Sequence, residues 1–237
     1  MHSNGQPTMD DEAPAATAEA APAPADWLPR LAHDLRSPLV ALGYAAQMLR
    51  SGRAPPQRID ELFATIDRQT AQLAKLAEEV SDMLQIGRDR FAMVHGQCDL
   101  YAIAREALQD PLAGGTFAAF ATGDAVGVRC DRARLVQLLR HLMRLTGKRK
   151  KGAELLTVEV RAESRHARLR ILDPASAIYR SDALLYLAHG TEPLDPGVLS
   201  MSDIIARRIL LAHAAVLTLG EFIDSRTGTL TLTLPAG

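Results

Sequence analysis

The chain is poor in cysteine and in aromatic residues. Among 237 residues there are two cysteines, and phenylalanine, tyrosine and tryptophan together make up 4%. Cys98 and Cys130 lie far apart in the sequence and show no CxxC or Cys/His spacing, which excludes a disulfide framework and a zinc site. We therefore expect two free thiols in a reducing compartment, the cytoplasm.

An excess of charge of one sign and long apolar runs are also lacking. The 27 basic and 28 acidic side chains leave a formal net charge of -1, so the overall charge attracts neither nucleic acid nor an anionic membrane. No apolar run reaches the roughly 18 residues that a membrane span needs, and the N-terminus lacks a signal-peptide pattern. No catalytic Ser/His/Asp set or metal-ligand spacing is present. Binding is expected to be local, without nucleic acid or a membrane span.

Residues 1–26 consist mainly of Ala, Pro, Asp, Glu and Thr and contain nothing large enough to bury. This composition predicts a disordered tail. The remaining length suits two domains, each with its own core.

Two long helices are predicted over residues 27–90. Apolar residues recur at steps of three and four from Trp27 to about Gly52, and again from Gln57 to Gly87, with a Gly/Pro break between them. The first stripe, which we expect to be buried, is Leu28, Leu31, Leu35, Leu39, Leu42 and Leu49; the second is Ile59, Leu62, Ile66, Gln69, Leu73, Leu76, Val80 and Met83.

Such an antiparallel helical hairpin cannot bury both stripes alone. A homodimer that forms a four-helix bundle is therefore expected. The alternative is a monomeric hairpin that lies against the next domain. In either case Trp27, Tyr44 and Phe63 are predicted to pack.

Residues 98–237 mix helical and alternating patterns, after a linker over 91–97. Helices are predicted over 99–108, 132–145 and 202–213, and strands over 156–162, 167–172 and 230–234. The fold class is therefore α+β, a hairpin followed by an α/β sandwich.

The segment from Leu31 to Leu39, LAHDLRSPL, carries the most specific chemistry. His33 falls off the apolar stripe and is expected to face solvent. Asp34 beside it can accept the Nδ1 proton and leave Nε2 free to attack phosphorus. Pro38 lacks an amide proton and should loosen the helix nearby. These features predict a phosphorylatable histidine.

The sequence HDLRSPL resembles the phosphoacceptor box of two-component sensor histidine kinases. The resemblance implies that His33 is the phosphoacceptor, that Asp34 orients its ring and that Arg36 screens the phosphate. Ser37 stands where the family positions water for phosphatase activity, a weaker match. The second domain resembles the Bergerat or GHKL ATP-binding domain.

Three nucleotide-binding elements of that domain are altered here. Where the family places two asparagines that hold Mg²⁺, this chain has His141 and Leu145, and leucine supplies no oxygen ligand. Asp173 corresponds to the aspartate that would contact the adenine amino group.

The glycines that follow this aspartate in the family are Ala175 and Ala177. The phosphate-binding glycine-rich loop retains Gly197, and Ser202 or Asp203 there suggests a helix N-cap. No metal held by this chain is therefore expected. Asp173 is interpreted either as an adenine contact or as a strand-end acid that makes a turn, and His141 is predicted to face solvent or cap a helix.

The predicted function is two-component phosphorelay signalling. A phosphoryl group on His33 would exchange with an aspartate of a response-regulator receiver domain, which supplies Mg²⁺, and an upstream histidine kinase could be the donor. The alternatives are an ATP-dependent soluble sensor kinase with an atypical site, and a non-phosphorylated scaffold that binds kinases or regulators. The basic run 148–151 is predicted to be a solvated loop, or else a docking site for an acidic receiver or for nucleotide phosphates.

Overall fold

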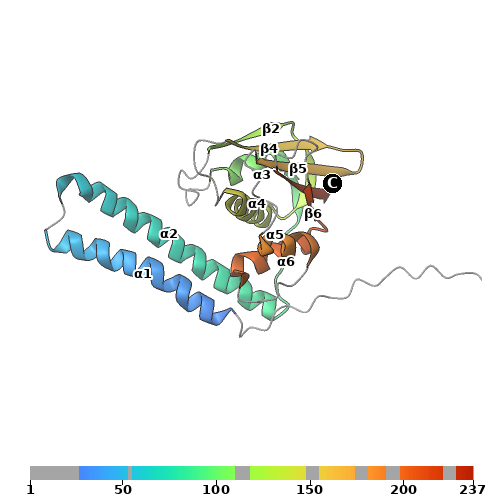
Figure 1. Cartoon of the computed structure of the whole chain (residues 1–237). Coiled ribbons are helices and arrows are strands. Elements are labelled where there is room, and N and C mark those ends of the chain that lie inside the picture. The colour runs from blue at the N-terminus through green and yellow to red at the C-terminus, as the bar shows by residue number, and fades with distance from the viewer. Residues whose placement is uncertain are drawn as a thin grey trace, which may run out of the picture.

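The computed structural model describes residues 27–52, 55–109, 118–147, 155–173, 181–190, 198–220 and 228–236. A helical hairpin precedes a mixed α/β domain that sits beside one end of it (Figure 1). The predicted α+β class is confirmed. The predictions for the tail at 1–26 and the basic run at 148–151 lie outside the described residues.

The hairpin consists of α1 (Leu28–Arg50) and α2 (Pro56–Gly87), each with a proline in its first turn. Proline suits this position because its missing N–H has no partner within the helix there. Pro38 lies inside α1, which continues through it.

The prediction that the whole α1 stripe is buried is wrong for the single chain. Leu28 is 52% and Leu39 is 55% exposed, and the predicted packing of Tyr44 and Phe63 also fails, at 59% and 53% exposed. In a single hairpin each helix has only one neighbouring helix, so apolar side chains on its other faces stay exposed. Trp27 is buried, as predicted.

A two-stranded antiparallel sheet joins the hairpin to the second domain. It pairs β1 (Gly96–Asp99) with β3 (Gly127–Cys130), and α3 (Leu100–Ala107) begins directly after β1. Asp99 caps α3 by accepting a hydrogen bond from the Tyr101 amide at 3.0 Å. Both cysteines are free thiols, as predicted, and burial raises the pKa of Cys130 to about 12.

The main sheet has five strands in the order β2-β4-β5-β7-β6. They are β2 (Ala118–Gly123), β4 (Leu155–Ala162), β5 (His166–Asp173), β6 (Val216–Gly220) and β7 (Gly228–Pro235). β2 and β4 are parallel, whereas the other pairs are antiparallel. Val160, Leu169, Leu232 and Leu217 form one buried row across four strands.

Three more helices, α4 (Arg132–Gly147), α5 (Asp182–His189) and α6 (Met201–Ala212), lie with α3 on one side of this sheet (Figure 1). Leu135, Leu138, Leu139 and Leu142 of α4 are fully buried in the shared core. The C-terminal half of α2 packs against α6, so the hairpin contacts the helical layer of the second domain.

Candidate functional site

His33 lies in the second turn of α1 with its side chain 80% exposed. Its Nδ1 is 3.2 Å from Oδ1 of Asp34. A proton on Nδ1 can therefore be donated to this carboxylate, which leaves the Nε2 lone pair in solvent. This arrangement can present a nucleophilic nitrogen to a partner.

Arg36 and Ser37 are exposed and lie three and four residues after His33. In an α-helix these spacings place side chains on the same face. The structure thus groups His33, Arg36 and Ser37 on one exposed face of α1, while their roles remain predictions.

The turn that carries His33 is supported from behind by apolar packing. Leu31 and Leu35 on α1 pack, half-buried, against the core that includes Leu76 and Met83 of α2, and Val80 joins them. Because α1 and α2 pack as an antiparallel hairpin, the N-terminal half of α1, with His33, lies against the C-terminal half of α2.

The N-terminus of α6 is closed by a capping box. Ser200 is the N-cap, and Asp203 Oδ2 accepts hydrogen bonds from the Ser200 backbone N at 2.7 Å and from its Oγ at 2.6 Å. The predicted cap residues, Ser202 and Asp203, are thus displaced: the cap is Ser200, and Asp203 is the third helical residue of the box.

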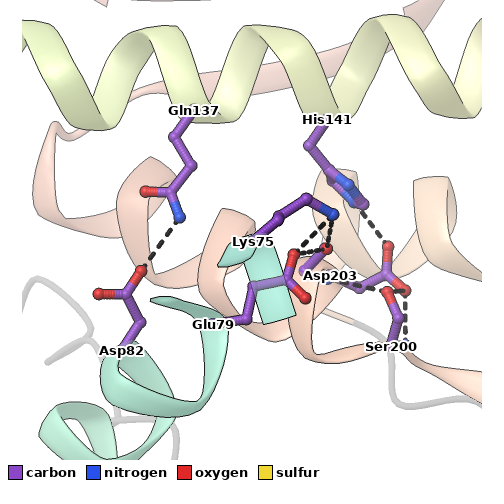
Figure 2. Close-up of polar contacts among 8 residues, drawn as sticks. Lys75, Glu79, Asp82, Gln137, His141, Ser200 and Asp203 are labelled. Atoms are coloured by element: carbon purple, nitrogen blue, oxygen red, sulfur yellow. Dashed lines mark hydrogen bonds and ion pairs between the residues drawn. The ribbon is translucent and has the colours of Figure 1, made fainter. Parts of the chain in front are cut away.

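His141 on α4 reaches the same carboxylate, with Nε2 2.8 Å from Asp203 Oδ1 (Figure 2). The prediction that His141 faces solvent or caps a helix is wrong, since its side chain is 8% exposed. The reason lies in the tertiary packing: the buried Asp203 carboxylate needs a hydrogen-bond donor, and His141 on α4 supplies it across the core.

Burial lowers the pKa of His141 below the ordinary histidine value, despite the opposing effect of Asp203. Burial opposes ionisation of Asp203, but the hydrogen bonds from His141 and Ser200 outweigh it and hold its pKa below the usual range. A neutral imidazole thus donates Nε2–H to an ionised carboxylate.

A further set of charged and polar side chains lies where α2 meets α4 and α6. Lys75 Nζ is 2.8 Å from Glu79 Oε1 and 3.3 Å from Ser202 Oγ, and Ser202 also donates to Glu79 (Figure 2). Both Glu79 and Asp82 are 5% exposed.

Asp82 Oδ2 accepts hydrogen bonds from Arg134 Nη1 at 2.6 Å and from Gln137 Nε2 at 3.0 Å. The Arg134 guanidinium also lies over the Phe91 ring, 4.5 Å from its centroid. We call the following set the polar seam: Lys75, Glu79, Asp82, Arg134, Gln137 and Ser202. It borders a cleft of roughly 670 Å³ between α2, α4 and α6.

Sequence reasoning missed the polar seam. Glu79 and Asp82 are ordinary acids next to an apolar helical stripe, and only their three-residue spacing, which puts both on one face, hinted at a shared partner.

The remaining predicted site residues are spread out or undescribed. Leu145 is half-buried and packs against the core. Asp173 is the last residue of β5, but its side chain lies outside the described part, as do Ala175, Ala177 and Gly197.

The hairpin matches a known protein family, and two sensor proteins are related in sequence to a larger part of the chain. Residues 25–89 match the His Kinase A (phospho-acceptor) domain family. The sensor protein DivL of Caulobacter vibrioides is 28% identical over 169 residues, 69% of this chain and 22% of DivL. The sensor protein CreC of Escherichia coli is 28% identical over 151 residues, 62% of this chain and 31% of CreC. The chain therefore spans less than a third of these relatives.

Solved structures share the fold of both parts. The histidine kinase AdeS of Acinetobacter baumannii aligns over 86% of this chain and 98% of its own with a TM-score of 0.60 at 19% identity. A bacterial phosphotransferase aligns over 88% and 94% with a TM-score of 0.55 at 16% identity. The histidine kinase ThkA, solved with the response regulator TrrA, aligns over 88% and 60%, also at 0.55 and 16%.

Within the described residues, no helix combines the length and apolarity that crossing a bilayer requires. The matched phosphoacceptor domain contains the HDLRSPL box, and the fold continues into the α/β domain that the solved kinases also carry. Residues 25–89 are thus a His Kinase A (phospho-acceptor) domain, and the chain is similar in sequence and fold to sensor histidine kinases.

Proposed function

We propose that the chain is a histidine phosphotransfer protein of two-component signalling, which carries phosphate on His33 and exchanges it with a receiver-domain aspartate. The observation that carries this proposal is the exposed His33 ring with Asp34 at Nδ1, inside a matched phosphoacceptor domain. A response regulator as partner agrees with the solved complex of ThkA and TrrA.

In the transfer, the Nε2 lone pair attacks phosphorus of an aspartyl phosphate. The N–P bond forms as the P–O bond to the aspartate breaks, and the released carboxylate stays on the receiver. The ring gains positive charge, which Asp34 next to it stabilises, and Arg36 on the same face can offset the charge of the phosphoryl oxygens. The receiver supplies the Mg²⁺ for this step.

The second domain of a histidine kinase implies Mg²⁺ and ATP, but the residues here do not fit them. An α-helix N-terminus attracts phosphate through its free amides. At α6 the Asp203 carboxylate already occupies this position, and His141 is committed to Asp203. Leu145 offers no metal ligand. These contacts support a relay that takes phosphate from an upstream histidine kinase or a receiver.

We propose a second copy of this chain as the partner of the hairpin. Leu39, Val40 and Tyr44 on α1 and Phe63 on α2 are each more than half exposed. An apolar surface of this kind on a helical hairpin favours a four-helix bundle with a second hairpin. We place this homodimer in the cytoplasm, which suits the free thiols Cys98 and Cys130.

The test uses a panel of receiver domains charged with labelled phosphate, each mixed with the full chain. We expect acid-labile label to move to the chain and to be absent from His33→Gln. Label from ATP and Mg²⁺ alone would instead favour an active kinase. Tight receiver binding without any transfer would favour a scaffold.

A further inference from the structure

The α2 segment behind His33 has two different faces. Leu76, Val80 and Met83 pack in the core that also receives Leu31 and Leu35 of α1. Because α1 and α2 run antiparallel, this part of α2 belongs to the half that lies against the N-terminal half of α1, which carries His33.

The other face of the same segment carries Lys75, Glu79 and Asp82, which point toward α4 and α6 (Figure 2). The C-terminal half of α2 is thus held between the second domain and the half of α1 that carries His33. Any shift of the second domain along α2 therefore acts on the part of the hairpin that packs against this half of α1.

The contacts of the polar seam can form in only one register of the second domain along α2. A buried ion pair adds little net stability, because its desolvation cost offsets its attraction, but breaking it leaves an uncompensated charge. Asp82 meets Arg134 and Gln137, while Glu79 meets Ser202 from another helix. Sliding the domain by one helical turn would leave both buried acids without these donors.

We propose that Glu79 and Asp82 are positioning residues for His33, which fix the second domain behind α2 and thereby fix the orientation in which the imidazole is offered to a receiver. This inference rests on the proposed function of His33 and says what the altered second domain contributes to it. Neither acid touches His33, so both act through the packing of α2 on α1.

The geometry matters because in-line phosphoryl transfer depends on the relative placement of nucleophile and phosphorus, and a misplacement of about 1 Å can cost roughly a hundredfold in rate. The positioning role predicts a slower transfer step at saturating receiver, with little change in the amount of label finally bound.

The experiment is a charge-swap cycle in the full chain: Asp82→Arg, Arg134→Asp and the two combined. Each single change places like charges opposite each other across the seam. We expect each to slow transfer from a charged receiver roughly tenfold and to speed hydrogen exchange of the amides over 28–36 and 75–86. The double variant restores opposite charges, and the Gln137 amide can turn so that its oxygen accepts from the guanidinium introduced on α2. Both readouts should therefore return toward the original values.

The matched control is the exposed pair Glu106 and Arg132, whose carboxylate and guanidinium are 2.6 Å apart on α3 and α4 away from α2. Glu106→Arg, Arg132→Glu and their combination should leave transfer and exchange over 28–36 unchanged. Asp82→Asn keeps a side chain of the same size and serves if Asp82→Arg does not fold, which a thermal melt establishes. It should give a smaller slowing in the same direction.

Two results would overturn the inference. One is an unchanged rate of phosphate transfer in single variants in which faster hydrogen exchange over 75–86 shows that the contacts of the polar seam are broken. The other is slow transfer that the double variant does not recover. If the unaltered chain takes no phosphate at His33, the proposed function fails. The positioning role is then judged from hydrogen exchange over 28–36 alone, and equal exchange rates in all variants would reject it.

Discussion

At the scale of single residues, we propose that the hydrogen bond between Asp34 and Nδ1 of His33 selects Nε2 as the reactive ring nitrogen. Asp34→Asn keeps a hydrogen-bond acceptor but removes the charge that stabilises the imidazolium. We expect phosphate uptake from a charged receiver to slow by about 10²-fold, with His33 still labelled at the end point. Rapid-quench measurements of label transfer check this, with the exposed Asp60→Asn as control. Equal rates for the two variants would remove Asp34 from the mechanism.

Two buried histidines make stability depend on pH. Burial lowers the pKa of both His141 and His213 below 6.5 in the folded chain. The unfolded chain therefore binds protons that the folded chain does not as pH falls through 6.5, so stability is full above this pH and is lost below it.

We expect the melting temperature to fall between pH 7 and pH 5, and to fall less in His141→Gln, whose amide can still donate to Asp203 without titrating. Calorimetric or dichroism melts across this range test the point. A pH profile of His141→Gln that coincides with that of the original chain would contradict it.

Gly123 at the end of β2 is a position that only glycine fits. Its φ is +114°, and an added Cβ would lie 2.0 Å from the Val160 carbonyl oxygen. Gly123→Ala should destabilise the chain by several kcal/mol, on the order of other large backbone and overpacking effects. Urea titration measures this, with Gly127→Ala as control because its Cβ would meet nothing within 4 Å.

At the scale of elements, the start of α6 is fixed by local chemistry. The Ser200 hydroxyl accepts from the Asp203 amide at 3.3 Å and donates to the Asp203 carboxylate. Ser200→Ala should therefore cost about 1 kcal/mol of unfolding free energy. The exposed Ser164→Ala is the comparison in denaturant titration, and equal losses for both would exclude a capping role.

The long helices and the alternating strands could be predicted from sequence because their periodicity is strong. The leucines of β7 are buried and its threonines at 231 and 233 face the other way, as the alternation indicates. β1, β2, β3 and β6 were missed, because each is short and gains its strand form from pairing with a distant partner. Helix α5 was also missed, although Ser181 and Gly190 mark its two ends.

In the candidate site, too, some contacts could be predicted from the sequence and others could not. His33 and Asp34 are neighbours in sequence, so the motif predicted both their contact and their exposure. The contact of His141 with Asp203 joins residues 62 positions apart, and that of Asp82 with Arg134 joins residues 52 apart. No local pattern encodes such pairs.

At the scale of the whole molecule, the proposed homodimer rests on the exposed apolar side chains of the hairpin. Replacing Val40 and Tyr44 together with glutamate places charge on that surface, and we expect a dimer to become a monomer in sedimentation equilibrium. The control is Val94→Glu, which alters an exposed valine in the linker. A monomeric original chain would exclude the homodimer.

The pairing of His141 with Asp203 also has an evolutionary consequence. Replacing His141 by a side chain without a hydrogen-bond donor leaves the buried Asp203 carboxylate without this partner, a loss of about 3–5 kcal/mol. Substitutions at position 141 are therefore limited to side chains that can still donate to Asp203. In related chains we expect the two positions to vary together.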